Sequence, residues 1–387
     1  LGDNAEPEEP PYGRMASVLN IHAEQDDFMT MTATNAKFMQ RFNIKRILSR
    51  WPALGAAAFT LALSGCETVN NTIYMTTGEV LKGYGKTHIV PYLNSTDDLE
   101  MACAMMEANT PLLMSFGRVT SSPDLLNVVM ALPAAGCEER RGWEAELEYM
   151  RALREKRPEA ATDALIKQKR HYINAASRYF SSWKALGRHF GEPGSGECPK
   201  FADDIEEFVY LAGLLSGLQA LNSEIQATYS IGVPKNIGAL VERAAGCLDD
   251  DEWWGVPMAM RAVVWALIPG AEPQGENAMA RLAAADAKGE AAGVRLTHVM
   301  HLLAASNKGD DALVRQIIKR HAQVTAEKPA DADWALVDRM ATLNILAISD
   351  RMWTEATGSR TPIGGLGTFW DERKGPAVEA MDLDSIF

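Results

Sequence analysis

The sequence has 387 residues, of which 47% are hydrophobic and 23% are charged, so it is long and apolar enough to bury a substantial core. It contains 38 Lys and Arg residues against 51 Asp and Glu residues, which gives a formal net charge of -13. Because an acidic chain repels the phosphate backbone of nucleic acids, this balance argues against a nucleic-acid partner.

The first 65 residues have the pattern of an export signal and not of a folded domain. An apolar run over residues 53–63 follows four basic residues, which are Arg41, Lys45, Arg46 and Arg50. The run is shorter than the roughly 20 apolar residues of a membrane-spanning helix, and it is typical of a secretory signal peptide. No later apolar stretch reaches that length. We therefore expect residues 1–65 to be absent from the mature domain.

The acidic, Pro-rich segment 1–37 looks like translation that begins upstream of the natural start. Candidate start residues are Met29, Met31 and Met39. A start at Met39 would give a signal peptide of ordinary length.

The signal segment ends in LSGC at residues 63–66, which resembles the lipobox of bacterial lipoproteins. The resemblance implies cleavage after Gly65 and a lipid on Cys66, which becomes the first residue of the mature protein. A lipoprotein carries several acyl chains, which together anchor stably. The next residue is Glu67 and not the aspartate that resembles an inner-membrane retention signal, so an outer-membrane, periplasm-facing location is favoured. The alternative for this segment is a buried helix with a core cysteine.

The mature chain divides by composition into a tether, a helical domain and a tail. Residues 66–95 are polar, contain glycine and include strand-like residues, and we predict that they form a tether. Residues 96–350 show helical periodicity, with an internal break at the Gly/Pro-rich segment 191–199. Residues 351–387 are rich in glycine and proline and are predicted to be irregular.

Helices are predicted from caps, periodic apolar residues and prolines. The first begins after the cap cluster at residues 95–98 and is interrupted at Pro111, and the next ends at Pro133. Gly213 and Gly217 lie four residues apart and would allow close approach of a neighbouring helix. Further helices are predicted over residues 138–157, 158–189, 203–229, 235–248, 255–268, 276–288, 291–306, 310–324 and 331–348.

These elements predict an all-α fold built as an array of antiparallel helical hairpins, either a TPR-like solenoid or a bundle. No run of alternating apolar and polar residues is long enough to indicate a sheet. The helix pairs recur every 30–40 residues or so, a spacing that suits stacked hairpins.

Four cysteines remain once Cys66 is set aside, and an even number is typical of disulfides in an oxidising compartment. They are Cys103, Cys137, Cys198 and Cys247. Four cysteines allow three connectivities, of which sequential pairing closes the shorter loops. We predict at least one bridge, while four reduced core thiols are the alternative.

Candidate metal and catalytic residues are sparse. His298 and His301 share a helix face and could grip a metal together, but no third ligand stands at a diagnostic spacing. Two partly exposed histidines on a polar stripe are the simpler interpretation. The acidic run 249–252 lacks the twelve-residue calcium-loop pattern, so a solvated turn is favoured. Phosphate loops and nucleophile elbows do not occur in the sequence. We predict no metal, no cofactor and no enzymatic activity.

Aromatic residues mark a candidate binding groove. Trp253 and Trp254 are adjacent at a predicted helix start, and Arg261 follows on the next helix. Adjacent tryptophans at a helix start are not expected to point into the same core, so we predict that one of them lines a groove that holds a ligand or partner. Burial of both at a corner between helices is the alternative.

Residues 207–268 resemble the TatT family of TPR-like periplasmic lipoproteins associated with TRAP transporters. The resemblance rests on EFVYLAGLLSGLQAL, VPKNIGALVERAAGCLDDDEWWG and AMRAVVWALIP. The small-residue helix, the acidic turn and the joint at Pro269 occupy the places that the family pattern gives them. The resemblance implies a scaffold that works with a periplasmic solute-binding protein and forms a homo-oligomer around a ligand-conducting pore.

Three functional hypotheses follow. The first is a lipid-anchored periplasmic scaffold that binds a partner protein and assists a TRAP-type transporter with a small ligand. The second is a lipid-anchored envelope enzyme with a site near His298 and His301. The third is an envelope-assembly lipoprotein without a transport role.

Overall fold

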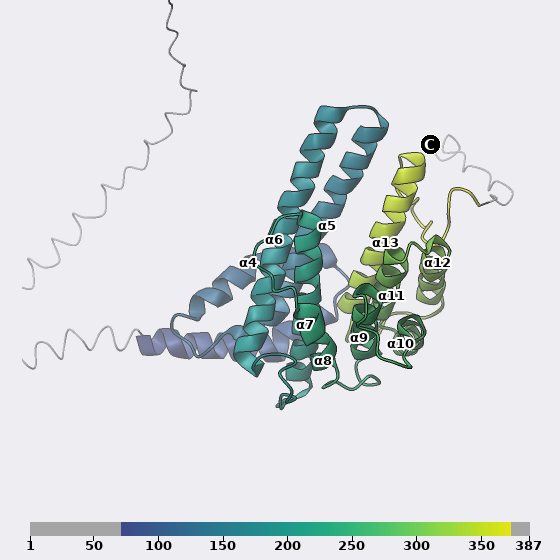
Figure 1. Cartoon of the computed structure of the whole chain (residues 1–387). Helices are drawn as coiled ribbons and strands as arrows, with labels where there is room; N and C mark the ends of the chain where they lie inside the picture. The colour runs from purple at the N-terminus through teal and green to yellow at the C-terminus, as the bar shows by residue number, and fades with distance from the viewer. Residues whose placement is uncertain (1–70, 373–387) are drawn as a thin grey trace, which may run out of the picture. The chain divides into compact units, whose positions relative to one another are not determined.

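The computed structural model describes residues 71–372, which are helical with connecting loops and contain no strand (Figure 1). Residues 71–84 form an α-helix that continues into a short π-helix, η3 (Gly85–Ile89), and then α3 (Val90–Asn94). The remaining helices are α4 (Leu99–Phe116), α5 (Asp124–Arg154), α6 (Pro158–Phe190), α7 (Asp204–Ala227), α8 (Ile237–Ala245), α9 (Val256–Leu267), α10 (Ala278–Ala292), α11 (Leu296–Asn307), α12 (Asp311–Glu327) and α13 (Ala335–Thr357). The all-α prediction is confirmed.

The N-terminal helix, by which we mean residues 71–94, replaces most of the predicted tether. Val90 and Leu93 lie in the core, where they are 3% and 5% exposed. A Cβ atom added at Gly78 would lie 2.0 Å from Cγ2 of Thr120, so this helix packs directly on the connection after α4. The β-branched and aromatic residues of the segment suggested extended structure, but tertiary packing overrides that local preference. The tether prediction is therefore wrong for residues 71–94.

Two prolines lie inside helices that they were predicted to end. Pro111 is within α4, and Pro133 is within α5, which runs unbroken for 31 residues. An internal proline costs about 3 kcal/mol through a lost hydrogen bond and a ring clash. Pro133 is buried in the same stretch as Met130 and Ala134, and the burial of that apolar surface offsets this cost.

The longest helices, α5 and α6, form a hairpin that packs on α7. Pro158 opens α6 at its first turn, as predicted. The predicted break at residues 191–199 is the loop between α6 and α7, which pack together, so it does not separate domains. Close approach at Gly213 and Gly217 is confirmed: added Cβ atoms would lie 2.6 Å from Leu186 and 2.4 Å from Trp183.

Successive helices from α4 to α13 pack on one another along the chain. The last helix, α13, also contacts α3, α4 and α5, so the array closes on its beginning. The connected ends of α5 and α6 extend past the end of α7 (Figure 1). The core of these helices joins residues from Val90 to Leu336 in one cluster.

The C-terminal segment is irregular from residue 358 to residue 372, as predicted, although α13 continues to Thr357. This segment is packed and not free. Phe369 is 3% exposed and joins a second apolar cluster with Ile318 and Ile345. The guanidinium carbon of Arg315 lies 4.6 Å from the centre of the Phe369 ring. The predicted tail beyond residue 372 lies outside the described residues.

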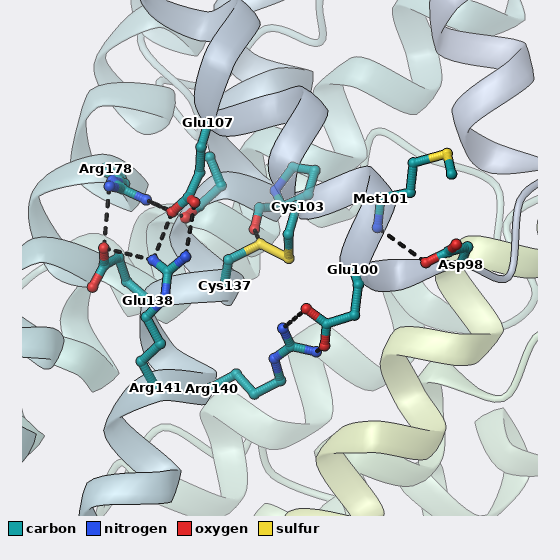
Figure 2. Close-up of a disulfide and its surroundings, with 12 residues drawn as sticks. Asp98, Glu100, Met101, Cys103, Glu107, Cys137, Glu138, Arg140, Arg141 and Arg178 are labelled. Carbon is teal, nitrogen blue, oxygen red and sulfur yellow. Dashed lines mark hydrogen bonds and ion pairs between the residues drawn. A yellow bond between two sulfur atoms is a disulfide. The ribbon is translucent and has the colours of Figure 1, made fainter.

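Two disulfides join neighbouring elements in sequential order. Cys103 of α4 bonds to Cys137 of α5, with 5.9 Å between their Cα atoms. Cys198, in the loop after α6, bonds to Cys247, which follows α8, with 5.4 Å between their Cα atoms. Both separations lie in the usual disulfide range. Figure 2 shows the first bridge between α4 and α5, with charged residues around it.

Candidate functional site

The two predicted histidines lie inside the protein and not on a polar surface stripe. His298 and His301 of α11 are only 1% and 6% exposed. Nδ1 of His298 lies 3.1 Å from Nδ1 of His321, which comes from α12. At this contact one ring must donate and the other accept. Nε2 of His321 lies 3.0 Å from Oγ1 of Thr342 in α13, so the pair ties three helices together.

Acidic residues of α10 complete this histidine cluster. Nδ1 of His301 lies 2.6 Å from Oδ2 of Asp286, and Nε2 of His298 lies 3.3 Å from Oε1 of Glu290. Burial lowers the pKa of His298, and it lowers that of His321 to about 3, so His321 is neutral at pH 7. In the described part of the chain, no three or more His, Cys, Asp or Glu residues are grouped to hold a metal ion.

The interpretation of His298 and His301 as partly exposed is wrong, because both side chains are buried. The local sequence pattern could not show this, since the partner His321 lies 20 residues or more away in the sequence. The cluster serves as a hydrogen-bonded interior contact among α10, α11, α12 and α13.

The predicted groove at Trp253 and Trp254 is also corrected. The two side chains are 3% and 7% exposed and both belong to the core. Trp254 has a φ of 54°, a left-handed conformation that changes the direction of the backbone between the two tryptophans, and both indoles reach the interior. The Trp254 ring packs 4.8 Å from that of Trp334, and the Trp253 ring packs 6.1 Å from that of Phe208.

Arg261 does not join the tryptophan pair to form a groove wall. Its guanidinium carbon lies 5.9 Å from the ring centre of Trp265, one turn further along α9. The acidic run before the tryptophans is a capped turn, in which Oδ1 of Asp249 accepts hydrogen bonds from the backbone N–H groups of Asp251 and Glu252. The prediction of a turn at residues 249–252 is confirmed.

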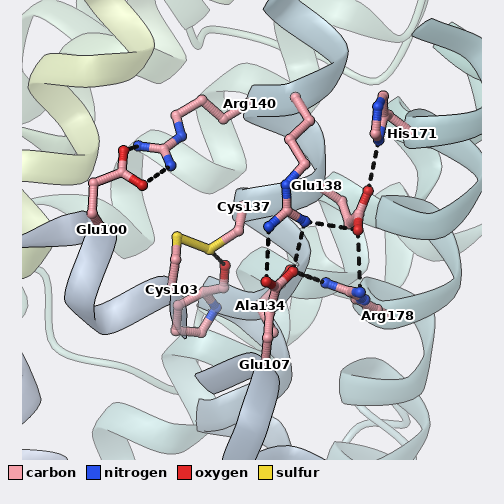
Figure 3. A network of polar contacts seen from close by, with 11 residues as sticks. Glu100, Cys103, Glu107, Ala134, Cys137, Glu138, Arg140, His171 and Arg178 are labelled. Carbon is pink, nitrogen blue, oxygen red and sulfur yellow. Dashed lines mark hydrogen bonds and ion pairs between the residues drawn. A yellow bond between two sulfur atoms is a disulfide. The ribbon is translucent and has the colours of Figure 1, made fainter. Parts of the chain in front are cut away.

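A polar network beside the first disulfide was not foreseen from the sequence (Figure 3). Arg141 of α5 donates two hydrogen bonds to Glu107 of α4, at 2.7 and 2.8 Å. Arg178 of α6 donates to the same carboxylate at 2.7 Å, and Glu138 accepts from Arg141 at 2.8 Å. Nδ1 of His171 lies 2.8 Å from Glu138.

Hydrogen bonds from Arg141 and Arg178 lower the pKa of Glu107 to about 2, so the group stays ionised under ordinary conditions. Each carboxylate of the network has at least one cationic partner. The network therefore fastens α4, α5 and α6 together near the disulfide. Its one local sequence signal is the three-residue spacing of Glu138 and Arg141.

One carboxyl group of α5 is buried without a cation. Glu139 is 4% exposed, and its Oε2 accepts a hydrogen bond of 2.9 Å from the hydroxyl of Tyr179. The side-chain amide of Gln219 lies 3.4 Å from the same oxygen. Burial raises the pKa of Glu139 to about 7. This residue is a titratable group inside the α5–α6–α7 packing.

A candidate interaction surface lies on the N-terminal helix, whose residues Ile73 and Tyr74 were assigned to the tether from the sequence. We define the N-terminal apolar face as Ile73, Val80 and Tyr84, which share one side of the helix, while Tyr74 and Met75 are exposed on its other sides. The exposed fractions of these five side chains range from 48% to 64%. No helix among residues 71–372 has the length and apolar character needed to cross a membrane.

Cys66, the predicted lipid attachment residue, lies outside the described residues. Comparisons of the chain with protein-family models, with curated proteins and with solved structures found no match. The resemblance of residues 207–268 to the TatT family therefore stays a prediction.

Proposed function

We propose that this protein is a lipid-anchored scaffold of the bacterial cell envelope that binds a partner protein on its helical array. The LSGC sequence that ends at Cys66, and the basic and apolar segments before it, support a lipid anchor. The two disulfides support a location in an oxidising compartment such as the periplasm.

The observation that carries the partner-binding role is the projecting hairpin of α5 and α6. These helices are 31 and 33 residues long, or about 45–50 Å each. Small buried residues, including Ala152, Ala161 and Ala164, line the seam near their connected end. Leu153 and Ile166 are 52% and 43% exposed there, so the packing of α5 on α6 leaves these apolar side chains accessible to a partner.

The hairpin is braced, which favours its use as a docking element. Arg360 binds Glu144 of α5 through both carboxylate oxygens, and Arg351 of α13 lies 3.5 Å from Glu146. Nη1 of Arg154 donates to the carbonyl oxygen of Ala356 at 3.2 Å. A surface that is already rigid loses less conformational entropy when a partner binds.

The partner class follows from the sequence pattern. The resemblance to the TatT family suggests a periplasmic solute-binding protein, which would pass a small ligand to a TRAP-type transporter. The acidic balance of the chain suggests a protein and not a nucleic acid as the partner.

Photo-crosslinking in intact cells tests this function. A photoreactive amino acid would replace Ile166 or Leu153 on the hairpin, and Tyr229, which is 62% exposed in the loop after α7, would serve as the control position. We expect one discrete crosslinked species at the hairpin positions and none at residue 229. No hairpin crosslink, or equal crosslinking at all three positions, would contradict the proposal, and a crosslink between two copies would replace it with self-association.

A further inference from the structure

The exposed side of the N-terminal helix carries large apolar residues together with two threonines, Thr77 and Thr87, and no charged residue. Ile73, Val80 and Tyr84 are separated by seven and four residues, a spacing that places them on one side of an α-helix. Tyr74 and Met75 are exposed in the first turns but point to other sides of the helix, and Tyr92 of α3 is 64% exposed further along. Of the 15 large hydrophobic residues that the described chain exposes, six therefore lie on this one helix.

The charges of the same helix are bound to the protein. Lys86 lies 2.8 Å from Asp203 and 3.0 Å from Glu206, at the start of α7. Lys82 donates to the hydroxyl of Ser121 at 2.7 Å and lies 3.2 Å from Glu79. The carboxylate of Glu79 in turn accepts from the backbone and hydroxyl of Ser121.

Glu79, Lys82 and Lys86 are the only Asp, Glu, Lys or Arg residues between positions 71 and 94. All of them are engaged with one another or with the connection after α4 and the start of α7. The N-terminal apolar face consequently presents aliphatic and tyrosine side chains without a formal charge among them.

The N-terminal apolar face lies close in sequence to Cys66, the proposed lipid attachment residue. Residue 71 follows Cys66 by five residues, which span at most about 18 Å when fully extended. Because the N-terminal helix packs into the domain through Gly78, Val90 and Leu93, it cannot swing away as a tether would. A lipid on Cys66 would therefore hold the beginning of this helix at the bilayer surface.

We infer that the N-terminal apolar face rests in the interfacial layer of the membrane that holds the lipid anchor. This inference rests on the proposed lipidation of Cys66. Apolar helix faces bury themselves about 5–10 Å deep at the boundary of headgroups and acyl chains, and tyrosine is enriched at that level. The helix lies on the membrane surface. The domain is therefore held in one orientation relative to the membrane, and no flexible tether separates the two.

Site-directed spin labelling of the mature, lipidated protein tests the inference. The five natural cysteines are occupied by two disulfides and the lipid, so a cysteine introduced by Val80→Cys is the one free thiol to label. Ile166→Cys on the α5–α6 hairpin is the matched control, because its side chain is also apolar and exposed. The protein is reconstituted into vesicles of phosphatidylethanolamine and phosphatidylglycerol without any other protein.

We expect collisions of the label at position 80 with oxygen to rise several-fold relative to collisions with a water-soluble nickel complex, while the label at position 166 stays aqueous. An aqueous label at position 80 in a protein whose fatty-acid labelling is intact would overturn the inference and leave the anchoring proposal standing. A label that is immobilised only in native membranes would overturn it in favour of a protein partner. Loss of fatty-acid labelling would instead refute the anchor itself.

Discussion

Arg295, the residue before α11, forms a buried ion pair with Asp338 of α13, and its side chain is 0% exposed. Its guanidinium donates to Oδ2 of Asp338 at 2.6 Å, and its backbone N–H donates to Oδ1 at 2.8 Å. The carboxylate thus fixes both the side chain and the start of α11. The pair joins α11 to the helix that closes the array.

Breaking this pair should be strongly destabilising, because the guanidinium would remain buried without its countercharge. We expect Asp338→Asn to lower the free energy of unfolding by about 3–5 kcal/mol. Urea unfolding at pH 7 measures the change. Glu148→Gln is the control, since Glu148 and Lys167 form an exposed pair that contributes about 0–1 kcal/mol. Equal, small losses in both variants would contradict the role of the pair.

Glu139 should make stability depend on pH. Because its pKa is raised to about 7 in the folded state, folding retains a proton that the unfolded chain loses above pH 4.5. The stability that protonated Glu139 contributes is therefore complete below pH 4.5 and is lost as the pH rises to about 7. Glu139→Gln keeps an acceptor for Tyr179 but does not ionise.

The measurement is the free energy of unfolding of wild type and Glu139→Gln from pH 4.5 to pH 8. We expect the variant to gain on the order of 3 kcal/mol relative to wild type across this window. In this range Glu107 is ionised in the native state, so it does not obscure the comparison. A difference that stays constant with pH would show that Glu139 is not the responsible group.

The burial of Trp254 changes what its removal should do. If it lined a groove, Trp254→Ala would weaken binding and leave the fold intact. Since it packs on Trp334 in the core, we expect a loss of about 3–5 kcal/mol in unfolding free energy, seen by urea unfolding followed by circular dichroism. Ile268→Ala, at a half-exposed position after α9, is expected to lose much less. A Trp254→Ala protein as stable as wild type would show that Trp254 is not a core residue.

The two disulfides predict a defined peptide map. Digestion without reduction should release one linked pair of peptides containing Cys103 and Cys137 and another containing Cys198 and Cys247. Mass spectrometry after alkylation identifies them. Removing either bridge, as in Cys198→Ser with Cys247→Ser, should cost about 3–4 kcal/mol by the loop-entropy argument. Four alkylated thiols in material from the periplasm would refute both bridges.

The elements that the sequence predicts well are those whose signals are local. Pro158 at the start of α6 and the acidic cap of α7 set helix boundaries through neighbouring residues alone, and the structure places them within a few residues of the prediction. Gly213 and Gly217 were correctly identified as points of close approach. These features depend on backbone chemistry within one or two turns.

Apart from the disulfides, the features that depend on distant partners were not predicted. Pro133 stays helical because its surroundings bury it, and the partner of Arg295 lies 43 residues further along the chain. The N-terminal helix was mistaken for a tether because its Thr, Ile and Tyr residues have high strand propensity. The position of Trp254 depends on a backbone φ of 54° that no sequence pattern indicated.

The central claim is that a lipid on Cys66 anchors the protein, and fatty-acid labelling tests it most directly. Cells that express the full chain or its Cys66→Ala variant are grown with a clickable fatty acid, and the labelled protein is followed through membrane fractionation. We predict that the full chain is labelled and sediments with the membranes, and that Cys66→Ala is an unlabelled, unprocessed precursor. Labelling of Cys66→Ala equal to that of the full chain would contradict the account.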